Sequence, residues 1–298
     1  MTLDRKLLQM VVKLTGWGVT LVCFYLIYQI FSENLGNYVF PDLDDYGVLV
    51  IIVGLFFCML GHWILVLSWF YQVKKKTDDF SKVDSFTVIG LSQFVKYLPG
   101  NFAHIIGRGY LARKLLSQKD IYLTLLVETF LIAIVAMLLG VSWFFGSLGE
   151  LMMVVDLNWV VIIVMGGFAV VGLFLLKRLV SYRLDMRLTF LLSGLYFISY
   201  IFHGLVIFLV FKYVLLADGI VLWECVAGFA LAFVFGYLLP GAPGGIGVRE
   251  YVFVMLFSAA VGEVVAIQAI LIHRLLTVAS DILFFILANY SRRFSQLG

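Results

Sequence analysis

Charged residues are scarce in this chain, since Asp, Glu, Lys and Arg make up 13% of its 298 residues. Soluble domains carry about 25% charged and about 45–50% apolar residues, whereas hydrophobic residues here reach 63%. Too few polar side chains are present to cover a surface that faces water. The composition therefore excludes an ordinary soluble domain and predicts a protein whose surface faces lipid.

Cysteine is rare as well, with Cys23, Cys58 and Cys225 each lying inside an apolar run. An odd, scattered set predicts neither a disulfide framework nor a metal site, so we expect small buried hydrophobic residues. The chain also lacks an HExxH helix, a P-loop and a dinucleotide-binding fingerprint. We therefore predict no enzymatic activity, no cofactor, no metal and no nucleic-acid partner.

Six uninterrupted apolar stretches are long enough to cross a bilayer, which takes about 20 helical residues. They lie near 12–31, 48–72, 121–145, 155–176, 188–213 and 264–288. Two further apolar stretches, 86–112 and 220–261, are broken by proline and glycine, which interrupt helices.

The distribution of basic residues orients these stretches, because cytoplasmic loops are rich in Lys and Arg. Of the 21 Lys and Arg, 18 lie in 1–13, 74–119, 177–187 and 292–293. The connections between these regions carry acidic residues instead. Both termini are then cytoplasmic, provided that the two broken stretches return to the side from which they enter. We therefore predict an all-α polytopic membrane protein with six transmembrane helices and two re-entrant broken-helix hairpins.

The two halves of the chain, 1–149 and 150–298, show an internal repeat with an offset of 141 residues. The matched positions are Leu98-Pro-Gly100 with Leu239-Pro-Gly241, Arg108 with Arg249, Tyr110 with Tyr251, and His62 with His203. The first half starts inside and the second outside, so the repeat is inverted. Inverted repeats with broken helices are typical of transporters, whose substrate sites lie near the midplane.

The second break carries four glycines and two prolines within residues 240–247. It predicts exposed backbone amides at a helix N-terminus, where anions bind, and a nearby arginine suited to phosphate. The expected anion or headgroup site comprises Pro240, Gly241, Gly244, Gly245, Gly247, Arg249 and Glu250. The alternative is a break that only allows close helix packing, with Arg249 and Glu250 as an internal pair.

The first break should have matching geometry, and its expected contribution is Pro99, Gly100, Asn101 and Arg108. Alternatively, Arg108 and Lys96 reach the cytoplasmic surface along their apolar stems.

Ionisable residues within the predicted spans indicate pathways or ion pairs, because a charge at the bilayer centre costs about 2.5–3.5 kcal/mol on insertion scales. Glu128, Arg274 and Asp281 are predicted to form an interior network with Arg249 that faces the hairpins. Ion pairs that only hold helices together are the alternative. His62 and His203 join the predicted polar network and are expected to be packed and hydrogen-bonded rather than to carry protons.

The motifs at 96–100, 107–108 and 243–250 together resemble the transmembrane domain of the lysylphosphatidylglycerol synthase family. The resemblance covers essentially the whole chain and implies a flippase-like domain of a bacterial or archaeal cytoplasmic membrane. In that family the membrane domain moves an aminoacylated phospholipid between leaflets and is fused to a soluble aminoacyl-transferase. This chain ends shortly after its last predicted span, so the synthase activity is not expected.

The sequence thus favours translocation of a phospholipid or polyprenyl-linked anionic lipid between leaflets. Two alternatives stay open. One is a non-catalytic membrane partner of a lipid-modifying enzyme or glycosyltransferase, and the other is a membrane-embedded enzyme that acts on lipid phosphates. Membrane lipids are the expected partners, and the glycines at 166, 167 and 172 could pack helices within a protomer or in a homo-oligomer.

Overall fold

The computed structural model describes residues 44–93, 96, 103–113, 115–146, 185–238 and 243–295, with five isolated positions between 21 and 32. Every regular element in these ranges is helical. The predicted span at 155–176 lies outside the described residues, and so does the predicted span at 12–31 apart from four of the isolated positions.

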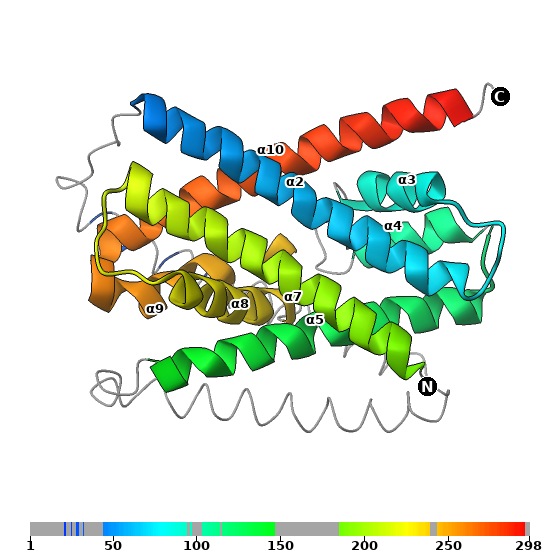
Figure 1. Ribbon diagram of the computed structural model, residues 1–298, viewed down its shortest axis with the longest axis horizontal. Helices are drawn as coiled ribbons and strands as arrows, with labels where there is room; N and C mark the ends of the chain where they lie inside the picture. Colours follow the sequence, from blue (N-terminus) through cyan, green and yellow to red (C-terminus); the bar gives the residue numbers. More distant parts are fainter. Residues whose placement is uncertain are drawn as a thin grey trace.

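Four long apolar helices form the body of the molecule (Figure 1). They are α2 (Asp45–Lys74), α5 (Gln118–Gly146), α7 (Met186–Leu209) and α10 (Glu263–Ser295). The α7 helix continues through a π-helical turn, Val210–Val214. All four are long and apolar enough to cross a bilayer. Four of the six predicted spans therefore correspond to helices of the right length and composition, and the chain is an α-helical, multi-pass membrane protein.

Two pairs of shorter helices fill the spaces between the long ones. The first pair is α3 (Lys82–Gln93) and α4 (Ala103–Ala112), and the second is α8 (Leu222–Leu238) and α9 (Val248–Val261). The two helices of each pair contact each other, and the pairs lie toward opposite ends of the long helices (Figure 1). Pro99-Gly100 and Pro240-Gly241, the predicted breaks, lie outside the described residues.

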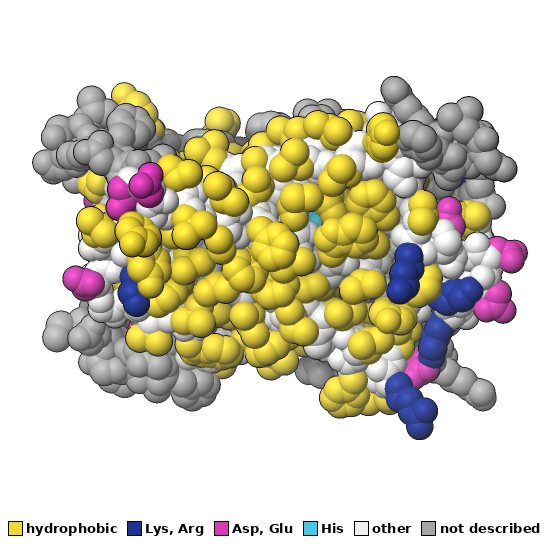
Figure 2. Space-filling model, turned by 45° about the horizontal axis from the view of Figure 1, so that its top comes forward, with side chains coloured by type: hydrophobic (Ala, Val, Ile, Leu, Met, Phe, Trp, Pro, Cys, Tyr) yellow, Lys and Arg dark blue, Asp and Glu magenta, His cyan; other side chains and the backbone are white. Residues whose placement is uncertain are grey.

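On the face shown in Figure 2, the exposed charged side chains lie toward the two ends of the molecule, and hydrophobic side chains cover the surface between them. Asp44 and Asp185 cap α2 and α7 at their N-termini by accepting hydrogen bonds from backbone amides. At the more basic end, Lys75 pairs with Asp185, and Lys76 lies 3.6 Å from Asp120. A charge-free band bounded by charged ends is the surface expected of a protein surrounded by lipid.

The helices approach one another closely where one of them carries a glycine. A methyl group built on Gly204 of α7 would lie 2.5 Å from the Cα atom and 2.7 Å from the backbone nitrogen of Val226 in α8. Backbone atoms cannot move aside as a flexible side chain can. Small residues are the usual means of close helix packing in membranes, where lipid tails remove the hydrophobic drive between helices.

We predict that Gly204→Ala destabilises the protein by about 1–3 kcal/mol, the usual cost of overpacking, because α7 and α8 must separate. Gly194→Ala in the same helix is the matched control, since nothing lies within 4 Å of the added methyl group. Thermal unfolding of both variants in detergent measures the difference. Equal melting temperatures for the two variants would contradict the close approach.

Candidate anion-binding cavity

A cavity of about 150 Å³ lies in the interior of the helix bundle, and its lining is largely apolar in area but carries several charged and polar side chains. Side chains from both halves of the chain line it. Its cationic lining consists of Lys96, Arg108, Arg249 and Arg274. Glu128, His62, His203, Gln93, Ser199, Thr277 and the hydroxyl-bearing Tyr196, Tyr200 and Tyr237 supply further polar groups. Phe229, Phe233, Leu65 and Ile132 contribute apolar surface.

Arg108 of α4 pairs with Glu128 of α5 in a site that excludes solvent, since the two residues are 3% and 5% exposed. Arg108 Nε also donates to the Ser92 hydroxyl at 3.3 Å, and its guanidinium lies over the Trp69 ring. Glu128 Oε2 is buried and has no hydrogen-bond partner among the described residues. The carboxylate therefore retains an acceptor that a donor entering the cavity could use.

Asp281 of α10 is fully buried and holds two basic groups together. Its Oδ1 lies 2.5 Å from His62 Nε2, and its Oδ2 lies 2.7 Å from Lys96 Nζ. The Nδ1 atom of His62 contacts the carbonyl oxygen of Cys58 at 2.9 Å. Both ring nitrogens of His62 thus face oxygen atoms, one on its own helix and one on α10, and these contacts fix the orientation of the ring.

Glu250, in the first turn of α9, connects the glycine-rich segment to α10. Its Oε2 accepts a hydrogen bond from Gly247 N at 2.6 Å, and its Oε1 lies 2.5 Å from Arg274 Nε. Arg274 also donates to the carbonyl oxygen of Gly244 at 3.3 Å. Both ends of this short segment are thus fixed by charge-assisted contacts, which are stronger than neutral hydrogen bonds.

The segment before α9 requires glycine for two separate reasons. Gly244, Gly245 and Gly247 have φ values of 59°, 70° and 87°, a region that other residues rarely occupy. A methyl group on Gly245 would also lie 2.9 Å from backbone atoms of Gly236. The Cβ position of Gly244 lies 3.7 Å from the carbonyl oxygen of Lys96. The segment therefore packs against α8 and meets the residue that follows the first broken helix.

Arg249 is 8% exposed and lies at the start of α9 against aromatic rings of α8. Its guanidinium carbon is 4.6 Å from the Phe233 ring centroid and 5.9 Å from that of Phe229. Arginine in this position gains a cation–π contact while its donors remain close to the cavity. The ring platform holds the guanidinium plane in place, which suits planar recognition of a phosphate.

The structure thus places most of the predicted site residues around one cavity. Arg108, Glu128, Arg249, Arg274, His62, His203 and Gly244 line it directly, and Asp281, Glu250, Gly245 and Gly247 lie behind the lining. Pro99, Gly100, Asn101, Pro240 and Gly241 lie outside the described residues.

Sequence reasoning left the tyrosines and Gln93 out of the site. Tyr200 donates to the carbonyl oxygen of Ile132 at 3.1 Å, and Tyr237 approaches Thr129 at 3.4 Å. Among 15 tyrosines in an apolar chain, no local pattern separates these from aromatic residues that face lipid. Their role follows only from the way the helices pack.

No family model matches the chain, and a search of curated proteins finds no match.

We predict that Asp281→Asn lowers the free energy of unfolding by about 3–5 kcal/mol, because breaking a buried ion pair leaves its partner charge uncompensated. Lys96 and His62 would both lose the carboxylate. Asp78→Asn is the control, since Asp78 pairs with Lys74 in an exposed contact and its loss should leave the unfolding midpoint unchanged. Denaturant titration in detergent gives both values. A midpoint of Asp281→Asn within error of the control would disprove the structural role.

Proposed function

We propose that this protein moves the anionic headgroup of a lipid, or of a lipid-linked molecule, across the membrane through the interior cavity. The main observation in support is that four cationic side chains line one cavity inside an apolar helix bundle, and two of them come from each half of the chain. Cations at membrane depth are expensive, are rare, and usually mark a substrate pathway. Their convergence from different segments favours a binding role over isolated ion pairs.

Phosphate is the group that this lining suits best. Arginine presents donors in a fork that matches phosphate oxygens, and Arg108 and Arg249 lie at positions related by the 141-residue offset. The positive end of α9 adds a partial charge, because the N-terminus of a helix attracts anions. The hydroxyls of Tyr200 and Tyr237 already donate to Ile132 O and Thr129 Oγ1, so their oxygens are left as acceptors for polar groups of a headgroup.

The cavity volume limits the substrate to a headgroup. About 150 Å³ is less than the roughly 300–1,000 Å³ of pockets that enclose a whole small molecule. Acyl or prenyl chains gain nothing from leaving lipid for protein, since both surroundings are apolar. In the proposed mechanism the phosphate therefore enters the cavity while the tail stays in the bilayer, and the barrier to crossing falls because the charge is never exposed to hydrocarbon.

The proposed inverted repeat would allow movement between two openings. In chain order the pairs α2 and α7, α3 and α8, α4 and α9, and α5 and α10 begin 140 to 145 residues apart, close to the offset of the proposed repeat. The pairs α3–α4 and α8–α9 lie toward opposite ends (Figure 1), as two hairpins entering from opposite faces would. We propose that both are re-entrant and that rocking of the halves opens the cavity to each side in turn. The sequence contains no P-loop, so we propose that the lipid moves down its own concentration gradient, which requires no nucleotide hydrolysis.

The resemblance to the lysylphosphatidylglycerol synthase transmembrane family points in the same direction, toward a flippase-like domain of a bacterial or archaeal cytoplasmic membrane. The distribution of Lys and Arg supports placing both termini in the cytoplasm. A phospholipid or a polyprenyl-linked glycan carrier satisfies the chemistry of the cavity equally well, because both present a phosphate at the end of an apolar chain. Membrane lipids are then the partners, and the soluble transferase activity of that family is not part of the proposal.

We predict that Arg249→Gln slows translocation of an anionic lipid about 10- to 100-fold, the factor that corresponds to losing one charge-assisted hydrogen bond of about 1.5–3 kcal/mol. The purified protein is reconstituted in vesicles that contain fluorescent phosphatidylglycerol. Dithionite added outside destroys the label in the outer leaflet, and continued loss of fluorescence reports flipping. Arg249→Lys should retain part of the rate, because it keeps the charge without the fork.

Lys212→Gln is the matched control, because Lys212 is also a cation but contacts Phe208 and Tyr213 and does not line the cavity. Its rate should equal that of the wild type. Equal rates in vesicles with and without wild-type protein would reject the proposal for phosphatidylglycerol, and a fluorescent polyprenyl phosphate would then test the other lipid class. Equal rates for Arg249→Gln and wild type would reject the role of the cavity.

A further inference from the structure

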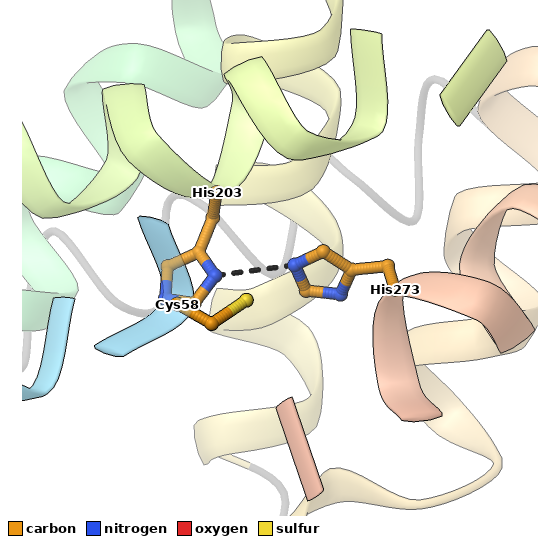
Figure 3. A group of neighbouring side chains, drawn as sticks. All are labelled: Cys58, His203 and His273. Atoms are coloured by element: carbon orange, nitrogen blue, oxygen red, sulfur yellow. Dashed lines mark hydrogen bonds between the residues drawn. The ribbon is translucent and has the colours of Figure 1, made fainter. Parts of the chain in front are cut away.

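Three side chains with metal-binding atoms converge beside the cavity from three different helices. Cys58 comes from α2, His203 from α7 and His273 from α10, and one ligand atom of each lies within 4.8 Å of the other two. Figure 3 shows the thiol of Cys58 pointing to the space between the two imidazole rings. We propose that these residues bind one thiophilic transition-metal ion, and that this ion is Cu(I). The proposal is independent of the lipid translocation proposed above.

The spacing of the nitrogens suits a shared metal ion. His203 Nδ1 and His273 Nε2 lie 3.1 Å apart. Two nitrogens each about 2.0–2.1 Å from one metal ion are separated by a similar distance, so a small outward movement of the rings admits an ion. A hydrogen bond between the two imidazole rings also accounts for the 3.1 Å separation of their nitrogens when no metal is bound. Such a bond does not explain why the Cys58 thiol lies beside the same two nitrogens.

The surroundings favour coordination over simple packing. Cys58 and His273 are both fully buried, so an ion held between them would be shielded from water. The Phe229 ring lies 5.0 Å from the His203 ring and 4.8 Å from the His273 ring, and it limits the ways in which either ring can turn.

The ligand set and its charge both favour Cu(I). Thiolate is a soft ligand that selects Cu(I) or zinc, and imidazole binds both. Structural zinc sites almost always have four ligands, whereas the described residues supply three. The Cys58 thiol loses its proton on binding, so Cu(I) gives a site of zero net charge and Zn²⁺ one of +1. A net charge is disfavoured in an apolar interior, and the cationic Arg249 already lies against Phe229.

His203 provides the route for the ion, because it belongs both to the cluster and to the cavity lining. An ion that reaches the cavity needs to pass only this side chain to reach Cys58, and the released thiol proton can leave by the same path. The sequence does not predict the site, because the second and third ligands are 70 residues apart and the first lies further away still. Metal motifs are recognisable only where ligands are close in the chain.

The test is a Cu(I) titration of purified protein in detergent, under anaerobic and reducing conditions, with bicinchoninate as the competing chromophoric chelator. Wild-type protein should take up one equivalent of Cu(I). Cys58→Ser should bind at least about 10- to 100-fold more weakly, since even the loss of an outer-shell partner has that effect. Cys225→Ser is the matched control, because Cys225 is an equally buried free thiol outside the cluster, and it should bind like the wild type.

X-ray absorption of the Cu(I)-loaded wild-type protein should show one sulfur and two nitrogen ligands, and it decides the question even if Cys58→Ser does not fold. Failure of the wild type to compete for Cu(I), or undiminished binding by a folded Cys58→Ser variant, overturns the proposal. Stoichiometric Zn²⁺ binding that depends on Cys58, without competition for Cu(I), overturns the choice of ion. Neither result bears on lipid flipping, which is measured separately.

Discussion

The structure depends on the requirement that charges buried in the apolar interior are compensated, by carboxylates at Lys96, Arg108 and Arg274 and by aromatic rings at Arg249. An isolated ion there is costly, and the cost is recovered only when an opposite charge and further hydrogen bonds surround it. Three ion pairs meet this requirement, and each joins different segments of the chain. Glu128 of α5 holds Arg108 of α4, Asp281 of α10 holds Lys96, and Glu250 of α9 holds Arg274 of α10. The pairs therefore decide where the short helices and their connecting segments lie against the long ones.

The same pairs give the cavity its chemistry. In the proposed function, an entering headgroup would compete for an arginine with the carboxylate that already neutralises it. One carboxylate oxygen of Glu128 has no hydrogen bond among the described residues. Both carboxylate oxygens of Asp281, in contrast, have basic partners. Glu128 is therefore held less firmly by its partner Arg108 than Asp281 is by Lys96 and His62. The exchange of partners is consequently easier at Arg108 than at Lys96. A cavity built in this way stays stable when empty and still offers cations to an anion.

The sequence identifies the right classes of residue but not their partners. Proline and glycine breaks and charges within apolar runs are local signals, and they indicate most of the charged residues that line the cavity. Partner choice depends on helix rotation and depth, which local patterns do not specify. Glu128, Arg249, Arg274 and Asp281 were predicted to form one network, whereas Glu128 pairs with Arg108 and Arg274 pairs with Glu250. Lys96 shows most clearly that local sequence does not specify the partner of a charged residue. Its sequence context is equally compatible with a side chain that reaches the membrane surface and with an interior ion pair with Asp281.

Helix α10 brings these interactions together. Arg274, Thr277 and Asp281 follow one another at helical spacing and face the cavity region, where they contact the glycine-rich segment and Lys96. The neighbouring His273 faces α7 and contacts His203. Any movement of α10 along or about its axis must therefore disturb contacts to both broken segments and to the histidine cluster together. Because packed helices shift between discrete arrangements rather than deforming gradually, α10 is the element through which a ligand in the cavity can influence both halves of the chain.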